Sequence, residues 1–374
     1  VTGVVVALTD DPSPVSTTYS NSDTSNANSP SPTTADAPPL PSPVAAPTVA
    51  PTEITDTADI LLQELETSIF RTDQDRVPFQ DPSSPQSLAF AWLSTDNITL
   101  SEDRPTSTVL ERYVAAVLYY STGGLSWSRK DVNVLSGLPV CDWNNKIPIN
   151  LAGTLGFFCE ETSTIRRIVL YDNGLAGTIP WELSLLVDLQ GLNLGMNALI
   201  GSIPTVLGDL KNLDFLQLTS NQLTGTIPTE LVGLPLLNYM DVSVNDLEGT
   251  IASGLGRLTG LTQLRLYNNS LTGSLPTELG QLTALTWLGL ANNELTGTLP
   301  TQLGQILTLQ YLYVYTNHLS GTIPTELGKC TELILLSLHE NVFDGTLPTE
   351  LGMMTVLETL AVNNNMLTGT STSE

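Results

Sequence analysis

Positive charge is scarce in this sequence. The 374 residues include 13 Lys and Arg against 38 Asp and Glu, which gives a formal net charge of −25. Proteins that bind nucleic acid neutralise its phosphates with clustered Lys and Arg, so this composition argues against a nucleic-acid partner. The acidic surface predicts solubility and a non-specific attraction for cationic ligands or divalent ions.

Histidines and phosphate-binding loops are also lacking. The two histidines, His318 and His339, stand at no useful spacing from the Ser, Cys or carboxylate residues that nucleophilic catalysis or a metal site requires. No glycine-rich loop follows an expected strand and opens a helix, as a phosphate-binding loop would. We therefore predict a protein without catalytic activity, metal ion or cofactor.

Long hydrophobic runs are missing too. The apolar opening, residues 1–9, is shorter than the about 20 residues that span a bilayer, and it fits the remnant of a transmembrane helix, the remnant of a signal sequence or an ordinary strand. Residues 10–55 are rich in Pro, Ser and Thr and contain no Lys or Arg, which predicts a disordered stalk. We expect either a truncated N-terminal membrane anchor that holds an extracellular head or a secreted protein.

An unbroken internal repeat dominates the rest of the chain. Nine asparagines follow one another at intervals of 24 residues: Asn173, Asn197, Asn221, Asn245, Asn269, Asn293, Asn317, Asn341 and Asn365. Leucine, or in a few turns another apolar residue, recurs 8, 5 and 3 residues before each asparagine and 2 residues after it, and a glycine follows at 4 residues after it. Residues alternate inward and outward before each asparagine, which predicts short strands stacked in one parallel sheet. A buried asparagine at each bend would bond the backbone of its own and the adjacent turn.

The repeat also sorts the three cysteines. Cys330 occupies an inward position that other turns fill with Leu, Ile or Met, so we interpret it as a buried free thiol. Cys141 and Cys159 precede the first strand, where the first core layer needs a seal, and a disulfide between them implies an oxidising compartment. Asn97 and Asn268 begin N-glycosylation sequons.

The region before the repeats predicts helices and a cap. Apolar residues at helical spacing indicate a helical collar over residues 56–105, with one short helix opening at Ser84-Pro85. Another helix is expected from about Ser107 to Tyr120, inside a cap that covers residues 106–164. The solenoid then occupies residues 165–374 in nine repeats, and because the last repeat stops in mid-turn we expect a fragment.

These features resemble a known family. The repeats, together with Ser126-Trp127, Cys141-Asp142-Trp143 and Cys159, are similar to plant-type leucine-rich-repeat proteins, in whose cap the two cysteines pair. The segments 81–86 and 89–93 resemble diatom leucine-rich-repeat proteins that carry a membrane span and a stalk. The resemblance implies an α/β solenoid: a leucine-rich-repeat arc with a parallel β-sheet on the concave face, an N-terminal helical cap and a preceding disordered stalk.

The outward positions of the expected strands define a candidate ligand site. Aromatic and charged side chains gather there: Arg167, Tyr171, Phe215, Tyr239, Asp241, Arg265, Tyr267, Trp287, Tyr311, Tyr313, Tyr315 and His339. One interpretation is lateral packing of aromatic residues on a sheet, and another is masking by a second chain. The functional interpretation is a shallow aromatic groove for an extended peptide, a protein or a glycan, with Asp241, Arg265 and His339 as polar handles.

Two further rows repeat with the same period. Thr or Ser stands 5 residues after each of the first eight asparagines, and this row suits either ordinary repeat filling or an ice-binding array. A row of glutamates, Glu182, Glu230, Glu278, Glu326 and Glu350, is interpreted as a solvated face without a metal. The leading hypothesis is a membrane-tethered receptor-like or adhesion module, and the alternatives are a secreted cell-wall or matrix protein of structural or inhibitor type and, last, an ice-binding solenoid.

Overall fold

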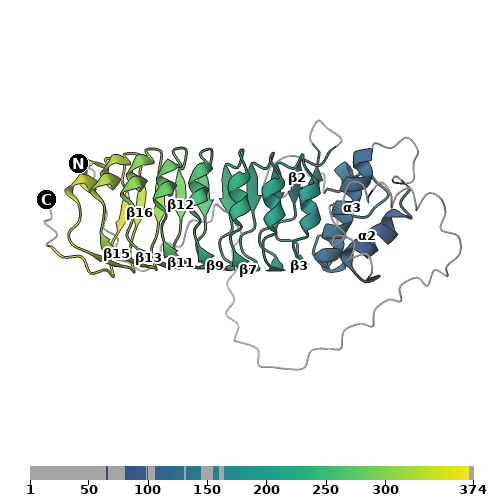
Figure 1. Cartoon of the computed structure of the whole chain (residues 1–374), viewed down its shortest axis with the longest axis horizontal. Coiled ribbons are helices and arrows are strands. Elements are labelled where there is room, and N and C mark those ends of the chain that lie inside the picture. The colour runs from purple at the N-terminus through teal and green to yellow at the C-terminus, as the bar shows by residue number, and fades with distance from the viewer. Residues whose placement is uncertain are drawn as a thin grey trace, which may run out of the picture.

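The structure is a computed structural model that describes residues 65, 81–97, 99, 106–129, 132–144, 155–159 and 164–369. The segments expected to be an anchor remnant and a stalk, residues 1–9 and 10–55, lie outside the described residues. Among the described residues no helix is both long and apolar enough to cross a membrane. Figure 1 shows an elongated solenoid with two helices at one end.

The two helices form the cap end. Helix α2 (Pro85–Leu93) begins after Ser84, whose hydroxyl accepts a hydrogen bond from the Ser87 amide at 3.1 Å, and Pro85 occupies its first turn. Helix α3 (Thr106–Ser121) packs against α2 and against the first turns of the solenoid. Short 3-10 helices η2 (Gly124–Ser126) and η4 (Val140–Asp142) follow.

One sheet of ten strands runs along the whole solenoid. Its strands are β1 (Gly156–Phe158), β2 (Arg167–Val169), β4 (Gly191–Asn193), β6 (Phe215–Gln217), β8 (Tyr239–Asp241), β10 (Gln263–Arg265), β12 (Trp287–Gly289), β14 (Tyr311–Tyr313), β16 (Leu335–Ser337) and β18 (Thr359–Ala361). Nine of them are parallel and pair residues 24 apart, so that equivalent positions stand side by side. Strand β1 is antiparallel to β2, a pairing that the repeat does not predict.

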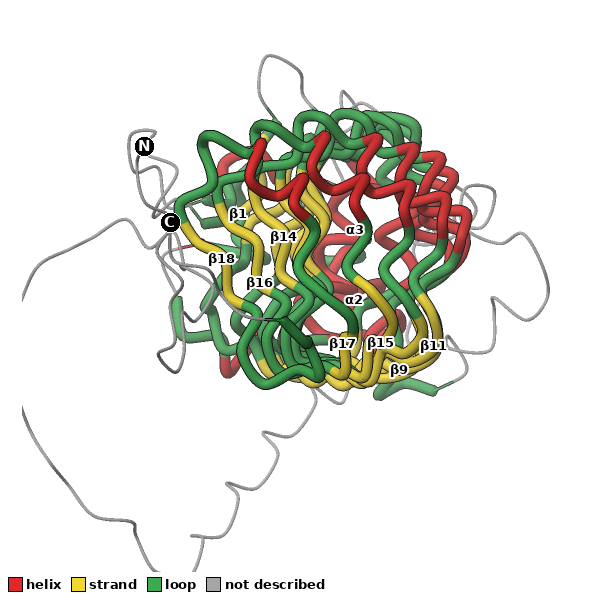
Figure 2. The backbone as a smooth tube through the Cα atoms, turned by 90° about the vertical axis from the view of Figure 1, so that its left-hand side faces the viewer, coloured by secondary structure: helices red, strands yellow, loops and turns green. Residues whose placement is uncertain are grey.

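A second sheet of eight strands lies on another side of the coil. Its strands are β3 (Ala176–Thr178), β5 (Ala198–Gly201), β7 (Gln222–Thr226), β9 (Asp246–Thr250), β11 (Ser270–Ser274), β13 (Glu294–Gly297), β15 (His318–Thr322) and β17 (Val342–Asp344). The repeat predicts a row of hydroxyls on this flank but not a sheet. The view along the solenoid shows the two sheets and the 3-10 helices on separate sides (Figure 2).

The third side of each turn is a single 3-10 helix. These helices are η5 (Trp181–Leu185), η6 (Thr205–Asp209), η7 (Thr229–Gly233), η8 (Ser253–Arg257), η9 (Thr277–Gln281), η10 (Thr301–Gln305), η11 (Thr325–Lys329) and η12 (Thr349–Met353). A proline precedes all but η8, where Ala252 takes its place. The repeated leucines fill the space between the three sides and are almost completely buried.

The asparagine ladder binds each turn to the next. The Asn245 Nδ2 donates to the carbonyls of Val242 in its own turn and Leu218 in the turn before, both at 3.1 Å. Its Oδ1 accepts the Leu223 amide at 3.0 Å. The same bonds recur at the asparagines from Asn197 to Asn365. The predicted ladder is confirmed from Asn197 onward, whereas the Asn173 Oδ1 accepts the Arg129 amide of the cap at 2.7 Å.

Candidate functional site

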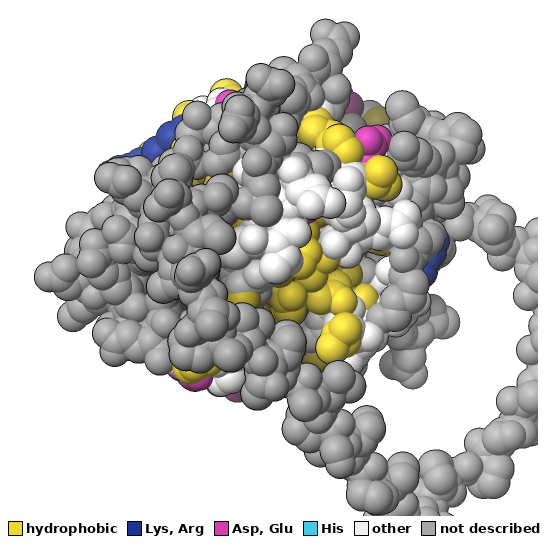
Figure 3. Space-filling model, turned by 90° about the vertical axis from the view of Figure 1, so that its right-hand side faces the viewer, with side chains coloured by type: hydrophobic (Ala, Val, Ile, Leu, Met, Phe, Trp, Pro, Cys, Tyr) yellow, Lys and Arg dark blue, Asp and Glu magenta, His cyan; other side chains and the backbone are white. Residues whose placement is uncertain are grey.

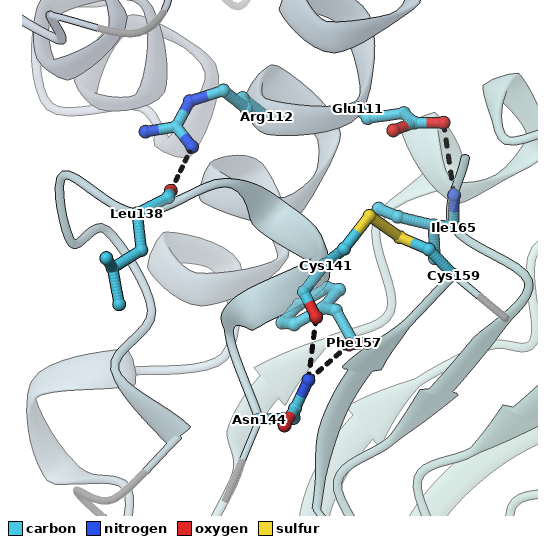
Figure 4. The surroundings of a disulfide bond; sticks show 8 residues. All are labelled: Glu111, Arg112, Leu138, Cys141, Asn144, Phe157, Cys159 and Ile165. Carbon is cyan, nitrogen blue, oxygen red and sulfur yellow. Dashed lines mark hydrogen bonds between the residues drawn. A yellow bond between two sulfur atoms is a disulfide. The ribbon is translucent and has the colours of Figure 1, made fainter. Parts of the chain in front are cut away.

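The disulfide at the cap positions the start of the ten-strand sheet. Cys141 and Cys159 are bonded, as predicted, and join η4 to the end of β1 (Figure 4). The Asn144 side-chain amide supports the same corner, donating to the carbonyls of Cys141 at 2.7 Å and Phe157 at 3.3 Å. Cys330 is a buried free thiol, as predicted, and burial raises its pKa to about 11.

Eight of the twelve predicted site residues form one continuous row of side-chain contacts. We call these eight the aromatic row: Phe215, Tyr239, Arg265, Trp287, Tyr311, Tyr313, Tyr315 and His339. Ring centroids lie 4.4 Å apart for Phe215 and Tyr239, 4.6 Å for Trp287 and Tyr311, 4.9 Å for Trp287 and Tyr313, 6.4 Å for Tyr313 and Tyr315, and 4.5 Å for Tyr315 and His339. Separations of this size are typical of stabilising aromatic contacts. The row crosses the turns from β6 to the residues that follow β16.

Arg265 joins the two halves of the aromatic row. Its guanidinium carbon lies 5.5 Å from the Tyr239 ring centroid and 4.8 Å from that of Trp287, within the range of cation–π attraction. The Asp241 carboxylate stands 3.9 Å from one guanidinium nitrogen, and the Gln263 side chain accepts from another at 2.9 Å. The cation is therefore held by two rings and two oxygen atoms.

The Asp241 carboxylate is held by hydrogen bonds from residues two before and two after it in the chain. Its Oδ1 accepts hydrogen bonds from the Ser243 amide at 3.0 Å and the Ser243 hydroxyl at 2.5 Å. The Tyr239 hydroxyl donates to Oδ2 at 3.3 Å. Burial raises the pKa of Asp241, whereas the bonds from Ser243 act in the opposite direction. Ser243 and Gln263 are supporting residues that sequence reasoning did not single out, because their roles depend on neighbouring side chains.

The row divides into accessible and inaccessible members. Phe215, Tyr239, Trp287 and Tyr311 are partly exposed. Tyr313, Tyr315 and His339 are 3%, 6% and 7% exposed, and Asp241 is 2% exposed. Of the three expected polar handles, Arg265 alone retains appreciable exposure, because Asp241 and His339 are covered by their neighbours.

Two small residues, Gly289 and Ala291, leave space for the large aromatic side chains beside them. Ala291 is buried in a separate hydrophobic cluster with Tyr313 and Tyr315, and Tyr267, Trp287 and Tyr311 pack around it. A Cβ atom added to Gly289 would come within 3.2 Å of the Tyr267 ring and 3.3 Å of the Trp287 indole nitrogen. Both large side chains therefore use the space that Gly289 leaves. Gly289, two residues after Trp287, is a sequence signal for this packing that was not predicted.

Burial also makes three tyrosines of this face weaker acids. Burial raises the pKa of Tyr313 to about 12 and raises the pKa of Tyr239 and Tyr267 above its ordinary value. Their hydroxyls stay protonated at neutral pH and keep a proton to donate.

Two predicted residues lie apart from the row. Arg167 in β2 bonds to the Asp214 carboxylate at 3.4 Å, and its side chain lies over Gly191 in the second turn. Tyr171 points its hydroxyl at the Met196 sulfur. Arg167 and Tyr171 thus belong to the cap end of the same face and do not join the aromatic row, while Tyr267, two residues after the end of β10, packs against the row.

Comparisons with known proteins agree with the repeat geometry. The Leucine Rich Repeat family matches residues 212–234, 260–282 and 308–330. This chain is a leucine-rich-repeat protein. No curated protein matches it.

Several solved plant structures resemble this leucine-rich-repeat protein. The ectodomain of the Arabidopsis thaliana receptor kinase GASSHO1/SCHENGEN3, in complex with CASPARIAN STRIP INTEGRITY FACTOR 2, is 34% identical over 70% of this chain and 30% of its own, with a TM-score of 0.59. The Arabidopsis HAESA ectodomain, in complex with an IDA peptide hormone ligand, is 30% identical over 70% and 42%, with a TM-score of 0.60. The plant peptide hormone receptor RGFR1, in complex with RGF2, is 38% identical over 54% and 32%, with a TM-score of 0.54.

The match covers these structures only partly. The chain spans about a third of the length of two of these structures, 32% of RGFR1 and 30% of GASSHO1/SCHENGEN3. A plant ice-binding protein is 24% identical over 69% of this chain and 87% of its own, with a TM-score of 0.52. At that identity the likeness shows the fold alone.

The eight-strand sheet of this leucine-rich-repeat protein presents the hydroxyl row. The row consists of Thr178, Ser202, Thr226, Thr250, Ser274, Thr298, Thr322 and Thr346, and all eight residues are exposed. Gly249 has a φ of 82°, and a Cβ added to it would come within 2.8 Å of the Thr226 Cγ2. A Cβ added to Gly273 would likewise come within 2.9 Å of the Thr250 Cγ2. Glycine is therefore required at this position for two reasons: the backbone has a positive φ, and the methyl group of the threonine in the preceding turn occupies the space where a Cβ would lie.

The glutamate row corrects one expectation. Glu182 is completely buried, because α2 and α3 of the cap cover it, and the Gln86 side chain donates to its carboxylate at 2.7 Å. Glu230, Glu278, Glu326 and Glu350 are exposed or partly exposed, as expected for a solvated face. Within the described residues no group of three or more His, Cys, Asp or Glu side chains is arranged to hold a metal ion. The predicted glycosylation sites Asn97 and Asn268 are both exposed.

Proposed function

We propose that this protein is an extracellular, non-catalytic recognition module that binds a peptide or protein segment on its ten-strand sheet. Two of the similar structures, RGFR1 and HAESA, are by name a peptide hormone receptor with its partner and an ectodomain with a peptide hormone ligand, and the GASSHO1/SCHENGEN3 ectodomain is in complex with CASPARIAN STRIP INTEGRITY FACTOR 2. The Cys141–Cys159 disulfide supports an oxidising, extracellular location. A receptor-like or adhesive role, with a membrane anchor preceding the stalk, is the form of the proposal that we favour over a secreted wall or matrix protein.

The aromatic row is the observation that carries the proposal. Phe215 and Tyr239 stack on each other, and Trp287 and Tyr311 contact each other and Tyr313, yet each of the first four keeps part of its surface exposed. Rigid aromatic groups of this kind supply contact area at a small cost in conformational entropy, and they are enriched among the residues that dominate binding energy. An extended chain lying across the strands would contact them one after another.

The test is a peptide and glycan array probed with the wild type and a double variant, Trp287→Leu/Tyr311→Leu. We expect peptides to bind the wild type, and the double variant to weaken binding at least about tenfold, since each buried aromatic contact contributes ~1 kcal/mol or more. Ile200→Ser/Val342→Ser is the control, because both residues are exposed on the eight-strand sheet.

Two results would contradict the proposal. Peptide binding that is unchanged in Trp287→Leu/Tyr311→Leu would place the site elsewhere, provided that the variant unfolds at the same temperature as the control. Binding of glycans but of no peptide would show that the ligand is not a peptide, and it would favour the alternative of a wall or matrix protein.

A second candidate function rests on the hydroxyl row of the eight-strand sheet. The row is exposed, repeats once per turn and has its threonine methyl groups seated on the following glycines. A regular array of this kind suits a flat, ordered surface such as ice. A second hydroxyl row, three residues after the ladder asparagines, consists of Thr224, Thr272, Thr296 and Ser320. Ile200, Glu248 and Asp344 interrupt this second row, and the interruption makes ice binding the weaker of the two candidates.

A further inference from the structure

We propose that the segment recognised by the ten-strand sheet is cationic, and that its Lys or Arg side chains lie on the Trp287–Tyr311 end of the aromatic row between carboxylates at the two edges of the sheet. This inference rests on the proposed function, because it names the chemistry of the ligand for the same face.

The charge distribution along the chain is the first support. After Arg265 the sequence has one cationic residue, Lys329, which lies in η11 on another side of the coil. The same stretch carries nine acidic residues: Glu278, Glu294, Glu326, Glu332, Glu340, Asp344, Glu350, Glu358 and Glu374. A field of one sign over half the solenoid steers partners of the opposite charge.

The cations on the ten-strand face are already occupied. Arg167 pairs with Asp214, and Arg265 faces Asp241 and two aromatic rings. The strands β12, β14, β16 and β18 with the residues beside them, 286–292, 310–316, 334–340 and 358–364, contain no Lys or Arg. This end of the face therefore offers rings and carboxylates without a competing cation of its own.

Two exposed carboxylates stand at opposite edges of this end. Glu340 follows β16, and its carboxylate accepts the Thr316 hydroxyl of the preceding turn at 2.8 Å. Glu358 directly precedes β18 and occupies the position that Asp214 has before β6, from which Asp214 reaches Arg167. Among the described residues neither Glu340 nor Glu358 forms an ion pair.

The molecule itself shows what these ring faces accept. The Arg265 guanidinium lies between Tyr239 and Trp287, with its carbon 4.8 Å from the Trp287 centroid. Beyond Trp287 the row continues with the partly exposed Tyr311, and among the described residues no Lys or Arg lies over its ring. A Lys or Arg of the partner placed on these rings would repeat the arrangement that Arg265 already forms, with Glu340 or Glu358 in the role of Asp241.

The experiment selects peptides from a displayed library of random 12-residue sequences on the wild-type protein at low salt. We expect the selected peptides to be enriched in Lys and Arg and to lose affinity as salt is raised. Glu340→Gln/Glu358→Gln should weaken them about fivefold, as expected when two partly exposed ion pairs are lost. Glu294→Gln/Glu326→Gln is the matched control, since it removes the same charge from the same half of the solenoid but from other faces.

Each remaining outcome decides against the inference. Equal weakening by the two double variants would show a general attraction to an acidic surface and no site. Neutral or acidic peptides that still depend on Trp287 would overturn the cationic ligand and leave the proposed function standing. Selected peptides that bind equally well to Trp287→Leu/Tyr311→Leu would remove the proposed site together with this inference.

Discussion

At the scale of single residues, the asparagine ladder stabilises the fold by hydrogen-bonding the buried backbone of adjacent turns. Each ladder asparagine uses one short side chain to satisfy backbone groups in two turns, and an unsatisfied buried polar group is costly. Asn245 is 9% exposed and bonds to Leu218, Leu223, Val242 and Ser243. Replacing Asn245 therefore removes hydrogen bonds from backbone groups in both turns at once.

We predict that Asn245→Ala lowers the free energy of unfolding by about 2–4 kcal/mol, because several buried backbone groups lose their partner. Urea unfolding followed by circular dichroism measures this change. Gln222→Ala, at an exposed position in the neighbouring strand β7, is the control and should change stability by less than about 0.5 kcal/mol. A loss no larger than that of the control would show that the ladder is dispensable in this turn.

Residue-level reasoning located the aromatic row but not its accessibility. The fixed period assigns Tyr313, Tyr315 and His339 to outward positions, and they do lie on the ten-strand sheet. Whether an outward side chain meets solvent or another ring depends on its lateral neighbours, and the alternation of a strand says nothing of those. Glu182 shows the same limit, since its repeat position predicts solvent while the cap buries it.

At the scale of elements, the junction between cap and solenoid buries two carboxyl groups, those of Glu111 and Glu182, away from water. Glu111 in α3 is 6% exposed, and its Oε1 accepts the Ile165 amide just before β2 at 3.1 Å (Figure 4). Burial raises the pKa of Glu111 to about 7, with Asp188 as a further repulsive charge. Burial likewise raises the pKa of Glu182, which faces Gln86 of α2 and Tyr113 of α3.

We predict that the cap junction is more stable in acid than at neutral pH. The folded pKa of Glu111 lies above its unfolded value, so its contribution is complete below about pH 4.5 and is lost as the pH rises towards 7. Hydrogen exchange of α3 and of the Ile165 amide, measured between pH 5 and 8, reports on this opening.

The variant Glu111→Gln should reduce the pH dependence of the junction between pH 5 and 7, because glutamine keeps the shape of the protonated acid and does not ionise. Glu332→Gln, at an exposed position far along the solenoid, should leave that dependence as in the wild type. A Glu111→Gln protein whose α3 exchange still rises with pH as steeply as in the wild type would show that other groups control the junction.

Repetition made the elements of the solenoid easier to predict than those at its start. The leucine positions identify the strands of the ten-strand sheet, and the paired cysteines mark the cap. Strand β1 escapes prediction because it is antiparallel and lies outside the 24-residue period. The cap end also carries a group of apolar side chains at the centre of its described surface (Figure 3), and no periodic pattern indicates which residues surround them.

At the scale of the whole molecule, three faces with different chemistry repeat along one axis. The ten-strand sheet carries rings, the eight-strand sheet carries hydroxyls, and the 3-10 helices carry scattered charges. Because each turn contacts mainly its neighbours, a change on one face leaves the other faces in place. The two candidate functions can therefore be tested separately on the same protein.

We predict that the hydroxyl row is separable from peptide binding. Should the eight-strand sheet bind ice, the wild type would inhibit ice recrystallisation, and Thr226→Lys/Thr298→Lys would abolish the effect by placing bulky charged groups two and five turns from the first strand of that sheet. The same variant should bind selected peptides within about twofold of the wild type, since a surface substitution on another face changes the free energy by less than about 0.5 kcal/mol. Recrystallisation that proceeds equally with the wild type and with a protein of similar size and charge would exclude the ice-binding candidate and leave the aromatic row as the one functional face to pursue.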